Sequence, residues 1–222
     1  MSEQALVALS GGQDSTTCLY WALARYGRGR VEAITFDYGQ RHRIELDCAA
    51  EIAAYAEVPH VVLPIDTFPA LGGNALMDAG EPVPEGETVN GELPSTFVPG
   101  RNLVFLTLAA AYGWPRGIDD LVTGTAQTDY SGYPDCRRAT IDALERTLSL
   151  GLERDIRIHT PLMHLSKKET VLLADELGAI AAMGLTHTCY RGERPPCGTC
   201  AACVLRAKGF REAGIPDPLT SS

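Results

Sequence analysis

Hydrophobic positions along the chain form two kinds of pattern. Strands are predicted at residues 5–9, 31–39, 60–66, 119–125 and 156–162, and the first of them, ALVAL, is apolar without alternation, which is typical of a strand buried on both faces of a parallel sheet. Apolar residues at helical spacing cover residues 15–25, 41–58, 102–114, 139–151 and 204–210. Ser166, with Glu169 three residues later, predicts a capping box that opens a further helix, which Gly178 ends.

The order of these segments predicts an α/β fold. Strands that alternate with helices give an open, mostly parallel, Rossmann-like sheet with helices on both faces. Residues 67–100 are rich in proline and glycine and predict an ordered excursion or lid rather than a core element. We expect one nucleotide-binding domain over residues 1–185 and a small C-terminal segment, 186–222, that packs on it.

Charge and composition narrow the classes of partner. The 222 residues include 28 acidic and 19 basic side chains, a formal charge of −9 that disfavours nucleic acid. No apolar run approaches the roughly 20 residues that span a bilayer, and the N-terminal residues lack the layout of a signal peptide. We therefore expect a cytoplasmic protein with neither a membrane nor a nucleic acid as partner.

A glycine loop follows the first predicted strand, at residues 10–15, with the sequence SGGQDS. Gly11 and Gly12 leave backbone N–H groups uncovered at the start of a helix, which suits an anion such as phosphate. The loop is neither a Walker A motif nor a GxGxxG fingerprint, and it has no lysine. We expect it to grip the terminal pyrophosphate of a nucleotide, with Asp14 helping to hold Mg²⁺. A plain strand-to-helix turn is the alternative.

Four cysteines crowd into fifteen residues near the C-terminus, with the spacing C-x7-C-x2-C-x2-C. Such thiolates can converge on one tetrahedral ion, and four of them leave no open position for catalysis, so the ion would be structural. An iron–sulfur cluster is the live alternative, and a group of reduced cysteines is the plain one. The predicted ligands are Cys189, Cys197, Cys200 and Cys203.

The glycine loop resembles the pyrophosphate loop of the N-type ATP pyrophosphatases (PP-loop, an adenine nucleotide alpha hydrolase-like fold). The further stretches FVPGRNLVFLTLAAAYG, DYSGYPDCR, TPLMHLSKKETV and CYRGERPPCGTCAAC follow in the order typical of the 7-cyano-7-deazaguanine synthase family. The resemblance runs from Leu6 to Phe210. It implies an ATP-dependent ligase that converts 7-carboxy-7-deazaguanine and ammonia to the nitrile, through an adenylated carboxylate and then an adenylated amide.

The same resemblance implies the cofactors, the assembly and part of the site. It implies a homodimer, zinc in the four-cysteine cluster, and ATP with Mg²⁺ at the loop. The ATP residues would be Leu9, Ser10, Gly11, Gly12, Gln13, Asp14, Ser15, Thr16, Thr17, Cys18 and Leu19. The missing lysine favours release of AMP and pyrophosphate over ADP.

Roles for other residues follow from their chemistry. Arg101 suits a carboxylate or phosphate, and Asn102 suits a polar edge, unless Arg101 is a surface residue and Asn102 the helix N-cap. Lys167 and Lys168 suit developing phosphate charge, although either is alternatively solvated. Lys168, with Asp14, Ser15 and Arg101, completes the predicted catalytic set. The segment DYSGYPD combines aromatic rings and carboxylates, which suit a planar heterocycle; a plain turn is the alternative. The predicted heterocycle-binding residues are Asp129, Tyr130, Ser131, Gly132, Tyr133 and Asp135.

Two other functions stay open. One is another adenylating amidotransferase or a tRNA-modifying enzyme of the same superfamily, against which the acidic charge and the lack of a basic appended domain speak. The other is a non-catalytic, zinc-stabilised nucleotide-binding module, which would bind ATP without turnover. No second domain for glutamine hydrolysis fits in 222 residues, so free ammonia is the expected nitrogen source.

Overall fold

A computed structural model describes residues 3–40, 43–68, 97–127 and 133–220. Most of the predicted excursion at 67–100 therefore lies outside the described residues. The strands are β1 (Ala5–Ala8), β2 (Val31–Asp37), β3 (His60–Pro64), β4 (Asp120–Val122) and β5 (Arg157–His159). The helices are α1 (Gln13–Tyr26), α2 (Ile44–Tyr55), α3 (Arg101–Gly113), α4 (Arg138–Leu152), α5 (Lys167–Glu176), α6 (Ile180–Met183) and α7 (Ala201–Ala213), with 3-10 turns η2 (Trp114–Arg116) and η3 (Pro134–Cys136).

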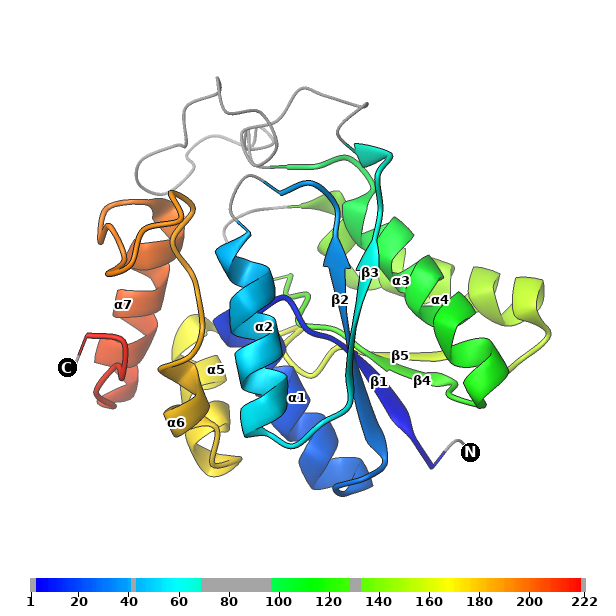
Figure 1. Cartoon of the computed structure of the whole chain (residues 1–222), viewed down its shortest axis with the longest axis horizontal. Helices are drawn as coiled ribbons and strands as arrows, with labels where there is room; N and C mark the ends of the chain where they lie inside the picture. The colour runs from blue at the N-terminus through cyan, green and yellow to red at the C-terminus, as the bar shows by residue number, and fades with distance from the viewer. Residues whose placement is uncertain (1–2, 41–42, 69–96, 128–132, 221–222) are drawn as a thin grey trace.

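The five strands form one parallel sheet in the order β3-β2-β1-β4-β5 (Figure 1). The chain runs outward from β1 through β2 to β3, and then returns to the other side of β1 for β4 and β5. The order therefore reverses between β1 and β4, which is where open α/β sheets bind ligands, outside the carboxyl ends of the strands. The predicted fold class is confirmed.

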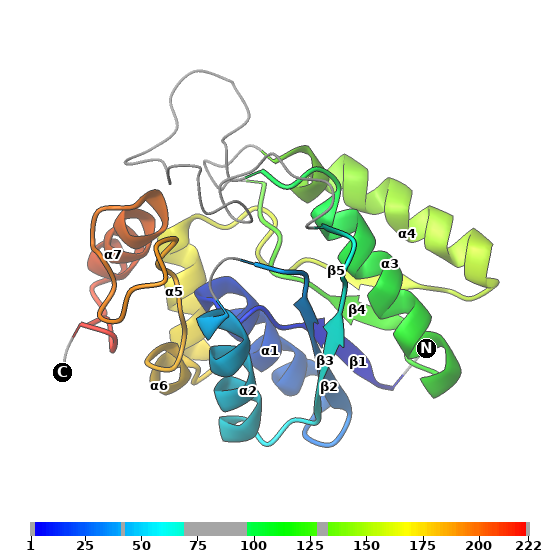
Figure 2. The same ribbon diagram turned by 45° about the horizontal axis from the view of Figure 1, so that its top comes forward.

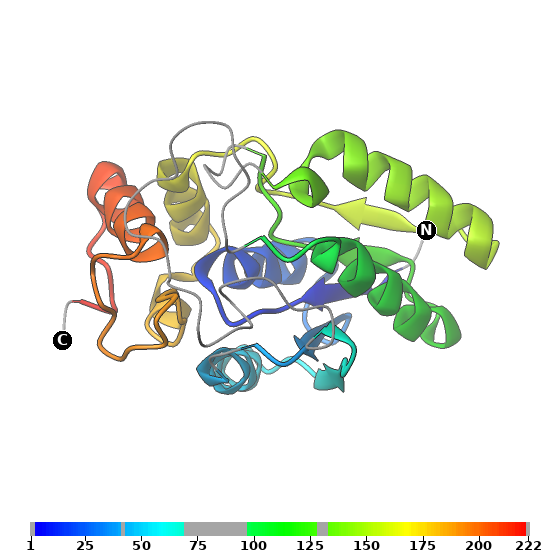
Figure 3. The same ribbon diagram turned by 90° about the horizontal axis from the view of Figure 1, so that it is seen from above.

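Helices cover both faces of this sheet, as seen along its edge in Figure 3. On β1, Ala5 and Val7 pack into the core cluster shared with α1 and α2, whereas Leu6 packs into the cluster shared with α3 and α4. All three residues are at most 1% exposed. Burial on both faces explains why this strand is apolar at every position.

Several elements are shorter than their patterns suggest. The strand predicted over 119–125 ends at Val122, and beyond it Gly124 lies against Asp14, whose backbone a Cβ there would approach to within 3.1 Å. Helix α2 ends at Tyr55, before the predicted residue 58, and Glu57 has a φ of 56°. The residues beyond the strand ends are therefore free to line a pocket.

The C-terminal segment packs on the helices that follow the sheet. Helix α7 lies beside α5 (Figures 1 and 2), and Gly209 permits this, because a Cβ there would meet the Lys167 backbone at 3.1 Å. Phe210 is buried with Val171 and Met183 in a small shared core. Within the described part of the chain, none of the helices combines the length and apolarity needed to cross a bilayer.

Candidate active site

A pocket of about 360 Å³ opens at the carboxyl ends of β1 and β4, at the point where the strand order reverses. Its lining joins segments that lie far apart in the sequence. Residues from the glycine loop, the ends of β2 and β4, the first turns of α2 and α3, and the C-terminal segment all contribute. Loops that follow several strands therefore meet at one edge of the sheet.

The glycine loop is held in shape by its own hydroxyl groups. Ser10 N donates to Ser15 Oγ at 3.1 Å, and the hydroxyls of Ser15 and Thr16 donate to Gly12 O at 3.1 and 2.8 Å. Gly11 has a φ of 80°, and a Cβ there would collide with Glu45 O. In the described part of the chain no side chain caps α1, which leaves its first N–H groups available to an anion.

Only part of the predicted ATP segment faces the pocket. Leu9, Ser10, Gly12, Gln13, Asp14 and Ser15 line it. Thr16, Thr17, Cys18 and Leu19 are fully buried along α1, where Thr17 Oγ1 donates to Gln13 O and burial raises the pKa of the Cys18 thiol. The second half of the segment therefore anchors the loop to the core.

Asp14 is the acidic residue of the loop, and its two oxygens differ. Oδ2 accepts a hydrogen bond from Lys167 Nζ at 2.7 Å, whereas Oδ1 is buried and has no partner among the described residues. A free carboxylate oxygen on a residue that lines this pocket is a ligand that suits Mg²⁺. Lys167 lines the pocket; Lys168, which we predicted for the site, is exposed and does not.

Arg101 projects from the first turn of α3 into the pocket. Its Nη1 donates to the Tyr38 hydroxyl at 3.2 Å, and the guanidinium carbon lies 5.6 Å from the centre of that ring. Burial lowers the pKa of Arg101, but the nearby Tyr38, Tyr133 and Glu45 outweigh it and raise the pKa overall. Arg101 is thus a fixed cation, available to a carboxylate or phosphate.

The predicted heterocycle loop is divided. Asp129, Tyr130, Ser131 and Gly132 lie outside the described residues, as do Arg41 and His42 after β2. Tyr133 lines the pocket, with its ring 5.5 Å from that of Phe97.

Asp135, in contrast, is 5% exposed and accepts from Asn102 N at 3.1 Å, so its carboxylate binds the N-terminus of α3. The Asn102 side chain lines the pocket, and its Nδ2 contacts Cys136 Sγ at 3.2 Å. Asp135 thereby ties η3 to α3 and so holds Asn102 in place.

The pocket also contains residues that the sequence analysis did not propose. They include Tyr38 and Gln40 after β2, Glu45 on α2, Thr125 after β4, and His187 and Arg206 of the C-terminal segment. The signal for the first two was present, since DYGQ stands at the end of a predicted strand. Thr125 Oγ1 is buried without a partner among the described residues, which leaves it available to a ligand.

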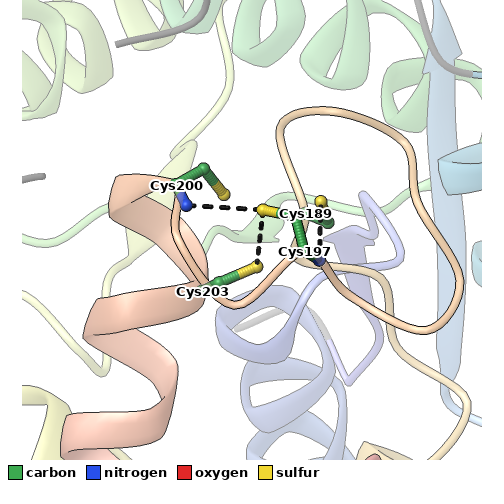
Figure 4. Close-up of side chains that lie close together, drawn as sticks. All are labelled: Cys189, Cys197, Cys200 and Cys203. Carbon is green, nitrogen blue, oxygen red and sulfur yellow. Dashed lines mark hydrogen bonds between the residues drawn. The ribbon is translucent and has the colours of Figure 1, made fainter. Parts of the chain in front are cut away.

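The four cysteines converge, as Figure 4 shows. Their sulfur atoms all lie within 4.8 Å of one another, and Cys197 Sγ is 3.9 Å from Cys203 Sγ. A tetrahedral zinc with bonds of about 2.3 Å would place its sulfurs roughly 3.8 Å apart, so the arrangement fits one ion. Burial raises the pKa of Cys197, but N–H groups of Cys200 and Thr199 outweigh it and bring the pKa to about 6.

His187 joins this cysteine cluster to the glycine loop. Its backbone N–H donates to Gly11 O at 2.9 Å, and its Nε2 lies 2.9 Å from Cys189 O. The side chain is 3% exposed. The cluster and the loop are therefore parts of one connected structure.

Comparisons with known proteins identify one family that is similar to this chain over nearly its whole length. The family model described as "Queuosine biosynthesis protein QueC" matches residues 4–214. A 7-cyano-7-deazaguanine synthase of Chromobacterium violaceum is 67% identical over 98% of this chain and 93% of its own length. The corresponding synthase of Laribacter hongkongensis is 65% identical over 98% and 94%.

Among solved structures, a predicted tRNA methyltransferase subunit from Methanocaldococcus jannaschii aligns at a TM-score of 0.49 and 24% identity, over 78% of this chain and 74% of that one. The family match, by contrast, extends over nearly the whole chain. With two relatives above 60% identity beside it, the chain belongs to the QueC family of queuosine biosynthesis proteins.

Proposed function

We propose that this QueC-family enzyme converts 7-carboxy-7-deazaguanine and ammonia to 7-cyano-7-deazaguanine, with two molecules of ATP. The observation that carries the proposal is a single pocket that contains both a phosphate-binding loop without lysine and the fixed cation Arg101. The loop suits the pyrophosphate of ATP, and the cation suits the carboxylate of the substrate. One site thus serves both reactants.

In the first half-reaction, a carboxylate oxygen attacks the α-phosphorus of ATP and pyrophosphate leaves. Ammonia then displaces AMP from the acyl carbon and gives the amide. In the second half-reaction, the amide oxygen attacks the α-phosphorus of a second ATP and pyrophosphate leaves, and loss of AMP and of both N–H protons then gives the nitrile. The N–H groups at the start of α1, with the Ser15 hydroxyl beside them, bind the departing pyrophosphate.

Lys167, rather than Lys168, is assigned the role of stabilising the charge that develops on the phosphates. Its ammonium group contacts Asp14 at the edge of the loop, where charge develops on the departing phosphates. Asp14 Oδ1 is the protein oxygen that would hold Mg²⁺, and the ion would supply charge neutralisation to the phosphates.

The deazaguanine ring is assigned to the space between Arg101 and Tyr133. Tyr133 supplies a ring face, and Asn102 supplies a polar group with both donors and acceptors. Asp129, Tyr130, Ser131 and Gly132 complete the proposed ring site. Asp135 is assigned a positioning role, because its carboxylate already binds Asn102 N.

Zinc is the proposed occupant of the cysteine cluster, and it would be structural because four thiolates fill its coordination shell. We assign the segment 186–222 to the same domain as residues 1–185, since Phe210 shares a core with α5 and α6. A homodimer and a cytoplasmic location belong to the same proposal. Val104 on α3, an apolar side chain that is 37% exposed, supports the homodimer, and the ATP that the reaction consumes supports the cytoplasmic location. Nucleic acid and membrane are not partners in this proposal.

The test is direct. Purified protein is incubated with 7-carboxy-7-deazaguanine, ammonium and Mg-ATP, and the base and nucleotide products are identified by mass spectrometry. Nitrile with AMP and pyrophosphate is the expected result. ADP in place of AMP would contradict the role of the loop. If the base is unchanged and ATP is consumed only when tRNA or another acceptor is supplied, the enzyme has the activity of another member of the superfamily.

A further inference from the structure

Glu45 lines the pocket, and the proposed reaction steps assign it no role. It sits in the first turn of α2, its backbone oxygen packs against Gly11, and its side chain lines the pocket beside Arg101. The pocket lining includes only two acidic side chains among the described residues, Asp14 and Glu45. Asp14 binds Lys167 through Oδ2 and its Oδ1 is assigned to Mg²⁺, so Glu45 is the acidic group to which no role is assigned.

Among the described residues, none forms a hydrogen bond or an ion pair with the Glu45 carboxylate. Within the same described part of the chain, the charged or titratable groups that face it are Arg101 from α3, the Tyr38 hydroxyl after β2, and Cys48 one turn along α2. Burial raises the pKa of Glu45 to about 7, in spite of the opposing effect of Arg101. The group therefore exchanges a proton near neutral pH, the range in which a general base works best.

The amide-forming step requires such a group. Near neutral pH the nitrogen source is mainly ammonium, which has no lone pair and cannot attack a carbonyl carbon. Of the described pocket residues, the cations Arg101 and Lys167 would repel it, and the uncommitted carboxylate would attract it. The ammonium ion must lose a proton in the pocket before the C–N bond forms.

We propose that Glu45 binds ammonium and accepts a proton from it as the nitrogen attacks the adenylated carboxyl carbon. This inference rests on the proposed function. The N–H bond breaks and its proton passes to a Glu45 oxygen; the C–N bond forms, and the C–O bond to AMP breaks with its electron pair leaving on AMP. Ammonium and acyl adenylate thus give amide, AMP and two protons, one on Glu45 and one released to water.

The experiment compares Glu45→Gln with the wild-type enzyme, using two nucleophiles. Ammonium needs a base, whereas hydroxylamine is largely neutral near neutral pH and reacts with acyl adenylates directly to give a hydroxamate. We expect Glu45→Gln to lower kcat/KM for ammonium by about 100-fold, the usual contribution of a general base, and to leave hydroxamate formation unchanged. Asp47→Asn is the matched control, because it removes the same charge from the same turn of α2 at an exposed position.

The pH dependence gives a second, independent readout. The ammonium defect of Glu45→Gln is expected to be largest near neutral pH and to narrow as pH rises, because free ammonia then supplies a nucleophile that has already lost its proton. A defect that is equal at every pH would contradict the proton transfer.

The other outcomes are equally decisive. Unchanged ammonium kinetics in Glu45→Gln would overturn the inference while leaving the proposed function intact. Equal loss of the ammonium and hydroxylamine reactions would overturn it too, and would mean that Glu45 only positions Arg101. Failure of the wild-type enzyme to form hydroxamate or nitrile would instead contradict the proposed function itself.

Discussion

The ion pair between Arg206 and Asp217 allows a quantitative test of how the C-terminal segment is attached. Arg206 is 4% exposed and binds both oxygens of Asp217, at 2.7 and 2.8 Å. The same guanidinium donates to Thr186 Oγ1 at 2.7 Å and to Met183 O at 3.1 Å. The pair therefore joins α7, the final turn of the chain and the segment that leads to the cysteine cluster.

Substitution Asp217→Asn leaves Arg206 as a buried charge without its partner. We expect a loss of about 3–5 kcal/mol in the free energy of unfolding, the usual cost of breaking a buried pair from one side. For a chain of this size this corresponds to a decrease in Tm of roughly 6–20 °C. Urea denaturation followed by circular dichroism measures the first quantity, and calorimetry the second.

The control is Asp155→Asn, which breaks an ion pair of similar length, 2.7 Å, with Arg157. Because the Asp155 side chain is 86% exposed, this change should cost at most about 1 kcal/mol. Equal costs for the two substitutions would refute the reasoning, since burial is the difference between them. The double variant Arg206→Met with Asp217→Leu should recover part of the loss, because it removes both buried charges.

Three further predictions concern Lys167 beside the glycine loop, the metal ion in the cysteine cluster, and the stability of the protein at acid pH. Lys167→Met should lower the rate of pyrophosphate release by about 100-fold and Lys168→Met should not; equal effects would contradict the placement of Lys167. Elemental analysis should find one zinc per chain, and its removal by a chelator should lower Tm; iron with visible absorption would contradict zinc. Burial raises the pKa of Asp120, but hydrogen bonds from Arg157 and His159 outweigh it and hold the pKa well below its ordinary value. This stability is present above the unfolded pKa of about 4 and is lost as pH falls below it, so Asp120→Asn should flatten the acid side of the stability curve.

The fold could be predicted from sequence because its signals are local. The apolar residues of the strands, the capping box at Ser166 and Gly27, which has a φ of 88° at the end of α1, each act within a few residues. The ends of the elements were less accurate. Helix α1 begins at Gln13 rather than Ser15, because Gly12 is extended and already acts as the N-cap.

The site was only partly predictable, because its geometry depends on how distant elements pack. Ser166 at the N-cap places Lys167 and Lys168 on successive positions of α5, and only the packing of α5 against α1 decides which of them meets Asp14. Glu45 looks like one of several polar residues on α2 until Gly11 is seen against its backbone. Distances in three dimensions, rather than residue types, separate these cases.

The central claim is that the glycine loop directs both activations to the α-phosphorus of ATP. The most direct test uses 7-carboxy-7-deazaguanine with ¹⁸O in both carboxylate oxygens, followed by mass spectrometry of the nucleotide products. The account predicts two AMP per nitrile, each with one ¹⁸O on its phosphate, since each substrate oxygen leaves bonded to an α-phosphorus. Label in inorganic phosphate together with ADP, or nitrile formed with unlabelled AMP, would contradict it.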